Sequence, residues 1–480
     1  MKEIKCPVKI FSIKTPNDTA LVDGEEEISY FELNNRIDAV IHSLRKLNIN
    51  RGMRVGVISE NSIQYVILIF SILRLGGIVV PINFRFGFLE IERIVSGMEI
   101  DLIISDMFGE DFSVSKINVC KFNDLAFRKT KQGIQKTENY FGDGKTIILT
   151  SGSTGIPKGV LLSVENHYYN AIGSNMNIAL EKKDRWLLAL PLFHVGGLAI
   201  LFRVFIAGAT VSLYSQKNGS IGKKIDKGGI THVSMVFTQI DRYVAYLKDK
   251  NPPEKLKAVL AGGSNIPVPL VKKCLDLKIP IYKTYGLTEM SSQVTTTDKV
   301  VNNLNLSTSG PVLKYRELSI GQENEIYVRG KTLFSGYISD RNFFPVSTDN
   351  NGWFNTGDIG FINNSGELFV TGRKDNMFIS GGENIFPEEI EAVLVDIAFI
   401  NDAVVIAVNN KKYGKRPVAF INCNKKVSLK EIYRKLLYVL PKFKIPDRFY
   451  VLEEIETSGI KRDRHRLIKM VENGEAIEFL

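Results

Sequence analysis

The stretch Thr146–Val160 reads TIILTSGSTGIPKGV. A short apolar run, Thr146–Thr150, leads into a loop rich in glycine and hydroxyl residues, and a second apolar run, Val160–Val164, follows it. We expect the two runs to be β-strands and the loop, Ser151–Lys158, to be the tip of a hairpin. Glycines let backbone N–H groups face inward, hydroxyls add donors and Lys158 adds a positive charge. This combination suits a polyphosphate.

The loop is not the P-loop of nucleotide hydrolases. The pattern GxxxxGK[ST] requires a helix after the lysine, because the helix N-terminus holds the phosphate, whereas a strand is expected here. Taken alone, the loop is equally compatible with a flexible surface hairpin. The residues expected to face a phosphate are Thr150, Ser151, Gly152, Ser153, Thr154, Gly155 and Lys158.

The composition is that of a globular protein with several domains. At 480 residues, a prior of about 150 residues per domain allows two to four domains. The net charge of +10 favours anionic partners, but the basic residues are scattered and form no block. Nucleic-acid binding is therefore weakly supported, and a charge that serves solubility is the simpler interpretation.

The cysteines and the apolar segments indicate a cytoplasmic protein without a membrane span. The four cysteines are far apart and form no CxxC pair, which fits reduced thiols. The N-terminus lacks the apolar region of a signal peptide. The most apolar stretch, Tyr65–Ile82, is interrupted by Arg74 and a glycine pair. The five histidines show no metal-site spacing.

The order of apolar runs predicts an α/β fold. A strand at Arg54–Ser59, a helix at Ser62–Leu75 and a strand at Ile78–Pro81 form a βαβ unit. The alternation resumes after the hairpin and continues to a strand at Ile281–Tyr285, so two doubly wound sheets packed together are expected. Residues 300–371 contain short β-runs that suit a small barrel, while residues 106–145 are irregular.

A smaller α+β unit is expected at the C-terminal end. Its rhythm begins near residue 376, and Pro387 opens a helix with two glutamates in its first turn. Ser29 with Glu32, and Ser428 with Glu431, are spaced as capping boxes. We therefore expect an N-terminal domain at 1–373 and a C-terminal domain at 374–480.

Three further motifs carry polar groups suited to a nucleotide. YGLTE, Tyr285–Glu289, follows a predicted strand, at the sheet edge where α/β proteins bind ligands. It offers a ring for a base, the Thr288 hydroxyl, and the Glu289 carboxylate for Mg²⁺. In WFNTGD, Asp358 could accept hydrogen bonds from ribose hydroxyls, and in GRKD, Arg373 could reach ribose or phosphate. Each motif alone is also compatible with an ordinary strand end or turn.

Together with the hairpin, these motifs resemble the adenylate-forming superfamily of acyl-CoA synthetases, luciferases and adenylation domains. The matching stretches are TSGSTGIPKG, YGLTE, TGD, and GRKD followed by SGGEN, and the resemblance covers essentially the whole chain. It implies that the N-terminal domain binds ATP and an acid. It also implies that the C-terminal domain turns about Asp375 between two half-reactions, bringing Gly381 and Gly382 to the CoA side.

Within this superfamily, the chain most resembles the o-succinylbenzoate–CoA ligases of menaquinone biosynthesis. The matching stretches are LPLFHVGG, LAILFRVFIAGA, THVSMVFTQ and KAVLAGGSNIP. The resemblance implies that His194 lies beside the carboxylate being activated, and that Ser234, Gly262 and Gly263 line the acyl and nucleotide pocket.

Arg203 is the informative residue for the choice of acid. It is the lone charge in Leu198–Ile206, within a helix expected over Leu198–Ala207, and it lies two helical turns beyond Gly196. A second carboxylate on the substrate would justify a half-buried guanidinium there. The alternative from the chain alone is that Arg203 extends to the surface, but the resemblance favours substrate binding.

The last motif is ETSGIKRDRHRL, which begins at Glu456. The superfamily usually places glycine directly before its catalytic lysine, whereas here Ile460 stands there and Gly459 is one residue earlier. Lys461 remains the candidate for that lysine. The departure affects the expected loop conformation more than the identity of the lysine.

The resemblance implies an acid–CoA ligase that uses ATP, Mg²⁺ and CoA, most specifically with 2-succinylbenzoate as the acid. Three alternatives remain open from the sequence: a ligase for a fatty or aryl monoacid, an adenylation enzyme that serves a carrier protein, and a non-catalytic nucleotide-binding or RNA-binding protein. A homodimer is compatible with the sequence.

Overall fold

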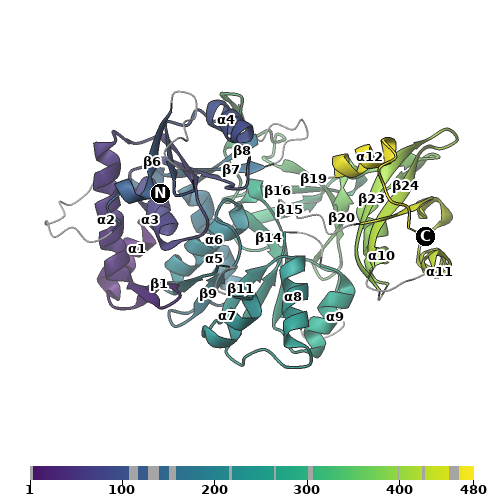
Figure 1. The fold of residues 1–480 in the computed structure, drawn as a ribbon, viewed down its shortest axis with the longest axis horizontal. Coiled ribbons are helices and arrows are strands. Elements are labelled where there is room, and N and C mark those ends of the chain that lie inside the picture. Colours follow the sequence, from purple (N-terminus) through teal and green to yellow (C-terminus); the bar gives the residue numbers. More distant parts are fainter. Residues whose placement is uncertain are drawn as a thin grey trace.

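The computed structural model of the chain describes most of its length. The described residues are 4–107, 117–127, 140–150, 158–215, 219–263, 266–300, 306–397, 399–423, 428–452 and 464–479. Within them, the strands form two sheets of eight strands, one of four and one of five. Figure 1 shows the strands of the C-terminal part set apart from the larger body that holds the two long sheets.

The first long sheet has a parallel centre and antiparallel edges. In spatial order its strands are β14 (Ser292–Thr296), β13 (Ile281–Leu287), β12 (Ala258–Ala261), β11 (His232–Met235), β9 (Arg185–Leu188), β10 (Thr210–Leu213), β1 (Thr19–Asp23) and β2 (Glu26–Ser29). Helices α7 (Ile221–Lys227), α8 (Phe237–Leu247) and α9 (Val268–Asp276) cover one face through their own apolar cluster.

The second long sheet contains the predicted hairpin. In spatial order its strands are β18 (Asn342–Pro345), β17 (Gly336–Ser339), β8 (Lys158–Ser163), β7 (Lys145–Thr150), β4 (Ile78–Ile82), β3 (Arg54–Ile58), β5 (Leu102–Ser105) and β6 (Asn118–Lys121). Strands β7 and β8 pair antiparallel from Lys145–Ser163 to Thr150–Lys158, which confirms the hairpin strands. Helix α4 (Phe88–Gly97) packs on the outer face.

The largest core lies between the two long sheets. It joins apolar side chains of both sheets to those of helices α2 (Tyr30–Lys46), α3 (Ile63–Arg74), α5 (Val164–Asn177) and α6 (Val195–Ala207), and α1 (Pro7–Lys14) packs beside α2. Nearly every residue of α3 is buried, so its apolar sequence serves the core. Helices that could span a membrane are absent from the described residues.

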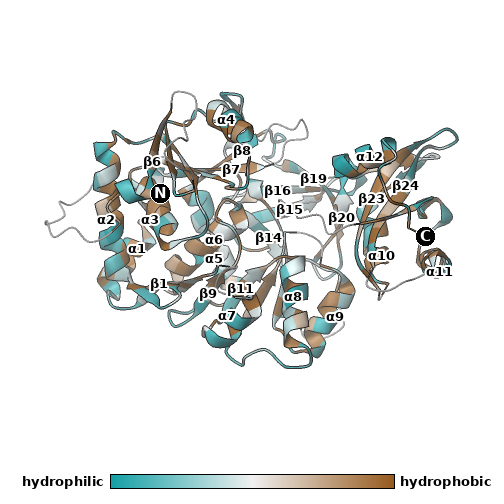
Figure 2. Cartoon of the chain, viewed as in Figure 1, coloured by the Kyte–Doolittle hydropathy of each residue, from teal (hydrophilic) through white to brown (hydrophobic). Residues whose placement is uncertain are grey.

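The remaining strands form two smaller sheets. Strands β15 (Arg316–Ile320), β16 (Glu325–Gly330), β19 (Phe354–Ile362) and β20 (Leu368–Arg373) make the four-stranded antiparallel sheet. The C-terminal sheet contains β22 (Glu383–Ile385), β21 (Phe378–Ser380), β24 (Gly414–Cys423), β23 (Ile400–Asn410) and β25 (Phe449–Val451). Helices α10 (Pro387–Val395), α11 (Leu429–Val439) and α12 (Arg464–Glu472) flank it. Figure 2 shows its long strands rich in hydrophobic residues. The predicted α/β class with a small C-terminal unit is confirmed.

Three local expectations differ from the structure. Ser29 caps α2 as predicted, because its hydroxyl accepts the Glu32 N–H, but the Ser428 side chain makes no such bond at α11. The region 106–145, expected to be irregular, contains strand β6. Helix α6 begins at Val195 rather than Leu198, because His194 already adopts the extended backbone of an N-cap.

One buried histidine makes the fold sensitive to acid. His167 on α5 stacks on Phe202 and shares a 2.8 Å hydrogen bond with the Thr146 hydroxyl. Burial lowers its pKa from 6.5 to about 3. The unfolded chain therefore binds a proton at this residue below pH 6.5, while the folded chain stays neutral there down to about pH 3.

We predict that H167Q gains stability relative to the wild type as the pH falls. Glutamine cannot take up a proton, so the variant loses the penalty of burying a titratable imidazole. The difference in unfolding free energy between the two proteins should shift by about 2 kcal/mol in favour of H167Q between pH 7 and pH 5. Urea titrations at both pH values measure it. A constant difference would contradict neutral burial of His167.

Candidate active site

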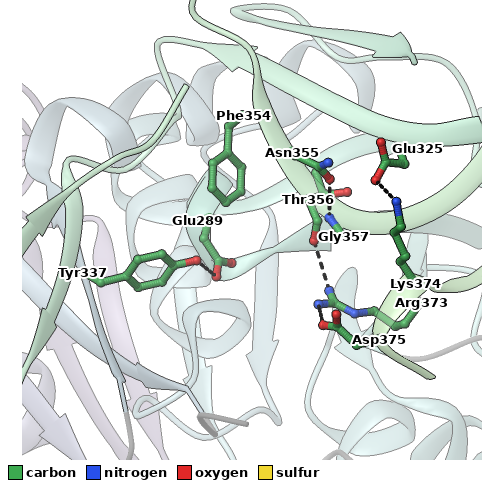
Figure 3. A pocket seen from close by; sticks show the side chains of 10 residues that line it. All are labelled: Glu289, Glu325, Tyr337, Phe354, Asn355, Thr356, Gly357, Arg373, Lys374 and Asp375. Atoms are coloured by element: carbon green, nitrogen blue, oxygen red, sulfur yellow. Dashed lines mark hydrogen bonds and ion pairs between the residues drawn. The ribbon is translucent and has the colours of Figure 1, made fainter. Parts of the chain in front are cut away.

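A cavity of about 360 Å³ is lined in part by residues predicted to bind the nucleotide and its metal. Its lining comes from the turn after β13, from β16, β17 and β19, from the last residue of β20 and from the two residues that follow it (Figure 3). The lining residues are Glu289, Glu325, Tyr337, Phe354, Asn355, Thr356, Gly357, Arg373, Lys374 and Asp375. Three of them, Glu289, Arg373 and Asp375, were expected from the sequence.

The carboxylate of Asp358 is the best-anchored group beside this cavity. The Tyr285 hydroxyl donates a 2.6 Å hydrogen bond to Asp358 Oδ2, and Arg373 Nη1 donates a 3.0 Å hydrogen bond to Asp358 Oδ1. Burial raises the pKa of Tyr285, and the Asp358 charge raises it further. The tyrosine therefore stays a donor, and its ring is held in one orientation.

Arg373 connects Asp358 to the start of the C-terminal part. Its Nη1 also donates to the Thr356 carbonyl at 3.2 Å, and its Nη2 contacts Asp375 Oδ2 at 3.2 Å. The neighbouring Lys374 pairs with Glu325 at 2.7 Å. Gly357 has a φ of +72°, a backbone conformation that favours glycine. These contacts fix the turn that presents Asp358.

Glu289 contributes a single carboxylate to the lining of the cavity. The Tyr337 hydroxyl donates a 2.8 Å hydrogen bond to Glu289 Oε1, which orients the carboxylate. Within the described residues no group of three His, Cys, Asp or Glu side chains could hold a metal ion. A single carboxylate fits Mg²⁺, which takes one or two carboxylates and completes its coordination with substrate phosphates and water.

The hairpin meets the same cavity through Tyr337. Strand β17 pairs with β8, so that Tyr337 stands opposite Val160, and Lys158 Nζ lies 5.9 Å from the centre of the Tyr337 ring. Thr150 donates to the Lys158 carbonyl across the hairpin at 3.3 Å. The other expected phosphate donors, Ser151, Gly152, Ser153, Thr154 and Gly155, lie outside the described residues.

His194 and Arg203 are both positioned by helix α6. His194 is the N-cap residue, and its ring contacts that of Phe193, with the ring centres 4.6 Å apart. Burial lowers the pKa of His194 to about 4, with a smaller effect from Arg85. The imidazole is therefore neutral near pH 7, and it can offer a hydrogen bond without carrying a charge.

Arg203 lies inside the protein. Its side chain is 1% exposed, its Nη2 donates to the Ser292 hydroxyl at 3.3 Å, and its guanidinium lies 5.8 Å from the Trp186 ring. The alternative that Arg203 extends to the surface is therefore wrong. Ser292 stands opposite Leu287 in the β13–β14 pairing. Arg203 thus contacts β14, the strand that pairs with the end of β13, where the YGLTE motif lies.

The remaining predicted residues lie on several elements. Ser234 is buried in β11, and its hydroxyl has no partner among the described residues. Gly262 follows β12, where a Cβ would meet the Thr284 side chain at 2.6 Å, and Gly263 has a φ of +85°. Thr288 follows β13 in a short 3₁₀ turn.

Two expected features lie on the C-terminal part. Gly381 and Gly382, with φ values of +58° and +90°, form the turn between β21 and β22. Lys461 lies outside the described residues.

Sequence reasoning missed Tyr337, Phe354, Asn355 and the Lys374–Glu325 pair. Lys374 stands inside the GRKD motif and could have been singled out. Tyr337 could not, because its position depends on the pairing of β17 with the hairpin.

Comparison with known proteins gives matches over nearly the whole chain. Residues 12–338 match the family described as AMP-binding enzyme, and residues 389–460 match its C-terminal domain. A 2-succinylbenzoate–CoA ligase of Bacillus cereus (strain ZK / E33L) is 31% identical over 467 residues, which are 95% of this chain and 96% of that protein.

Two solved structures of an o-succinylbenzoate CoA synthetase from Bacillus subtilis have the same fold. The complex with the acyl-adenylate intermediate has a TM-score of 0.88 at 28% identity and covers 97% of this chain and 98% of its own. The complex with ATP and a magnesium ion has a TM-score of 0.84 at 27% identity, with coverage of 96% and 99%.

We predict that D358N weakens ATP binding selectively. The amide keeps the size of the side chain, but it cannot accept from Tyr285, Arg373 and a ribose at once. The KM for ATP in ATP–pyrophosphate exchange should rise roughly tenfold or more, the worth of one hydrogen bond to a charged group.

E317Q is the matched control for this prediction. Glu317 lies in the same sheet and makes an exposed ion pair with Arg329 at 2.6 Å, so its loss should have little effect. An equal KM for ATP in the two variants would exclude a nucleotide role for Asp358.

Proposed function

The chain belongs to the family of AMP-binding enzymes, and from this premise we propose that it is an ATP-dependent acid–CoA ligase for 2-succinylbenzoate. The reaction converts 2-succinylbenzoate, ATP and CoA to 2-succinylbenzoyl-CoA, AMP and pyrophosphate, through an acyl-adenylate. This step serves menaquinone biosynthesis.

The buried guanidinium of Arg203 is the observation that carries the choice of acid. An acid-activating enzyme needs no cation at the far end of a monoacid, and burying a charge without a partner is costly. A substrate with a second carboxylate would supply the missing negative charge. Similarity to 2-succinylbenzoate–CoA ligases at 31% identity supports the same substrate.

We propose that the first half-reaction takes place between the hairpin and the Asp358 turn. The aromatic carboxylate of the acid attacks the α-phosphorus of ATP, and pyrophosphate leaves. Tyr285 stacks on the base, Asp358 accepts from the ribose hydroxyls, and Arg373 reaches the ribose or the phosphate. Thr150 and Lys158, together with the loop between them, hold the leaving phosphates.

Negative charge builds on the phosphoryl oxygens in the transition state, and fixed positive groups stabilise it. These groups accelerate the reaction because they bind the transition state more strongly than the ground state. Lys461 would bridge the α-phosphate and the attacking carboxylate. Thr288 and Glu289 lie beside the same phosphates, and Mg²⁺ bound by Glu289 would supply charge neutralisation. His194 lies beside the attacking carboxylate of the acid. Because its imidazole is neutral, it does not form an ion pair that would hold the carboxylate back from the phosphorus.

For the second half-reaction we propose that a mobile C-terminal domain, residues 374–480, turns against an N-terminal domain, residues 1–373. Asp375 is the hinge, and its contact with Arg373 must break or be remade during the turn. The movement removes Lys461 and brings Gly381 and Gly382 to the pantetheine path. The CoA thiol then attacks the acyl-adenylate and AMP leaves. Closure of this kind is a common step of turnover.

The proposed setting is the cytoplasm, and the proposed partners are small molecules. All four cysteines are free and three of them are buried, as expected where thiols stay reduced. The proposal leaves a homodimer open.

A panel of acids tests the function directly. We expect CoA thioester to form with 2-succinylbenzoate at a kcat/KM at least about a hundredfold above that with benzoate or hexanoate. With either monoacid, the buried guanidinium of Arg203 would have no carboxylate to neutralise it, which is unfavourable. Thioester and pyrophosphate are measured together. Equal use of hexanoate would favour a monoacid ligase. Adenylation of 2-succinylbenzoate without CoA transfer would favour a carrier-protein enzyme.

Separate assays of the half-reactions test Lys461. K461A should abolish acyl-adenylate formation, because its charge acts on the α-phosphate. The same variant should still form thioester from supplied acyl-adenylate. K469A, on α12, serves as a control that removes a nearby lysine. Equal losses of both half-reactions in K461A would remove Lys461 from its assigned role.

A further inference from the structure

Three arginines are almost completely buried in the described part of the chain: Arg74 at 2% exposure, Arg203 at 1% and Arg316 at 4%. Arg74 has the partner that a buried cation normally requires, because its Nη1 lies 3.2 Å from Asp38 Oδ1. Among the described residues, no ion pair is found for Arg203 or Arg316. These two are the exceptions that require an explanation.

The contacts of Arg203 and Arg316 are neutral. Arg203 donates to the Ser292 hydroxyl. Arg316, at the start of β15, donates to the Lys314 carbonyl at 2.9 Å and to the Asn170 carbonyl at 3.4 Å. The Nε atom of each arginine is buried without a hydrogen-bond partner. Each guanidinium therefore keeps a donor that the surrounding protein does not use.

The two arginines share the same surroundings. Asn170 on α5 accepts from Arg316 and donates to the Met290 and Gln293 carbonyls, which flank the Ser292 that contacts Arg203. Asn175, on the same helix, donates to the Arg203 carbonyl. Helix α5 and the start of β14 thus form a common frame for both guanidiniums.

The shared region holds further unused polar atoms. Asn170 Oδ1, Ser174 Oγ and Gln293 Oε1 are buried and have no partner among the described residues. Buried polar groups are nearly always hydrogen-bonded. Of these three groups only the Ser174 hydroxyl can donate to an anion, because the two amide oxygens accept and need a donor such as water.

The positive charges of the two arginines repel each other. Burial lowers the pKa of each guanidinium to about 9, and the charge of Arg203 contributes to the lowering at Arg316. Two cations in one low-dielectric region repel each other, whereas one anion between them would remove both penalties.

The chain accommodates Arg316 at a cost. Gly173 lies within α5, where a Cβ would come within 2.6 Å of Arg316 Nη1. A glycine inside a helix is less favourable than alanine by about 1 kcal/mol. Helix α5 therefore has a residue of low helix propensity at the position that the Arg316 guanidinium contacts.

We propose that Arg316 is a second specificity-determining residue, and that Arg203 and Arg316 together bind one carboxylate, the distal carboxylate of the acid. This inference rests on the proposed function for the identity of the acid. Two guanidiniums offer several N–H donors, and a guanidinium can bind a carboxylate through two parallel hydrogen bonds. The same chemistry would also bind a free small anion such as chloride, and the experiment separates the two sources.

The test compares two acids in four proteins. The acids are 2-succinylbenzoate and 2-butanoylbenzoate, in which a methyl group replaces the distal carboxylate. The proteins are the wild type, R316M, R316K and the control R74M, in which a buried arginine with its own carboxylate is lost. KM and kcat are measured by CoA thioester formation.

We expect R316M to raise the KM for 2-succinylbenzoate roughly ten- to hundredfold, the worth of one hydrogen bond to a charged group. Its kcat, and its KM for 2-butanoylbenzoate, should stay within about twofold, as for a group that binds substrate and transition state alike. R316K should fall between R316M and the wild type. R74M should affect both acids equally, mainly through a lower Tm.

An equal change of KM for both acids in R316M would overturn the proposal and leave Arg316 a structural link between β15 and α5. The proposed function would survive that result. If the wild type uses neither acid, the proposed function fails, and the anion site is then tested by the effect of chloride on the Tm. Replacing sodium gluconate with sodium chloride at equal ionic strength should then raise the Tm of the wild type and R74M but not that of R316M, and an equal rise in R316M would exclude the site.

Discussion

The carboxylate of Asp358 is the contact on which the nucleotide site depends. It accepts from Tyr285 of the first long sheet and from Arg373 at the end of the four-stranded sheet. Arg373 in turn contacts Asp375, where the C-terminal part begins. A single buried carboxylate therefore contacts Tyr285 and Arg373 directly, and it is linked to Asp375 through Arg373. Loss of its charge would weaken both direct contacts and leave Arg373 less well positioned for its contact with Asp375.

Buried positive charge has a different role on the acid side. Arg74 is neutralised within the protein by Asp38, whereas Arg203 and Arg316 have no ion-pair partner among the residues that the structure describes. Sites that bind anions often keep such uncompensated cations, and they lose stability in the free state as a result. We propose that the hairpin and Glu289 determine the reaction, and that Arg203 on α6 and Arg316 on β15 determine the acid.

The sequence predicted the features that local chemistry determines. The hairpin strands, the βαβ units, the YGLTE and TGD positions and the isolated charge of Arg203 were all visible as patterns. Tyr337 and Arg316 were not, because each acquires its role from a partner distant in the chain: Val160 across a strand pairing, and Asn170 on α5. The helix start at Val195 was also missed, because the glycines after His194 resemble a loop.

A crystal structure of the chain with a stable sulfamoyl analogue of the 2-succinylbenzoyl-adenylate tests the central claim most directly. The account predicts that both ribose hydroxyls lie within hydrogen-bond distance of Asp358 and that the distal carboxylate lies between the guanidiniums of Arg203 and Arg316. A distal carboxylate that contacts neither arginine, or a ribose bound away from Asp358, would contradict it.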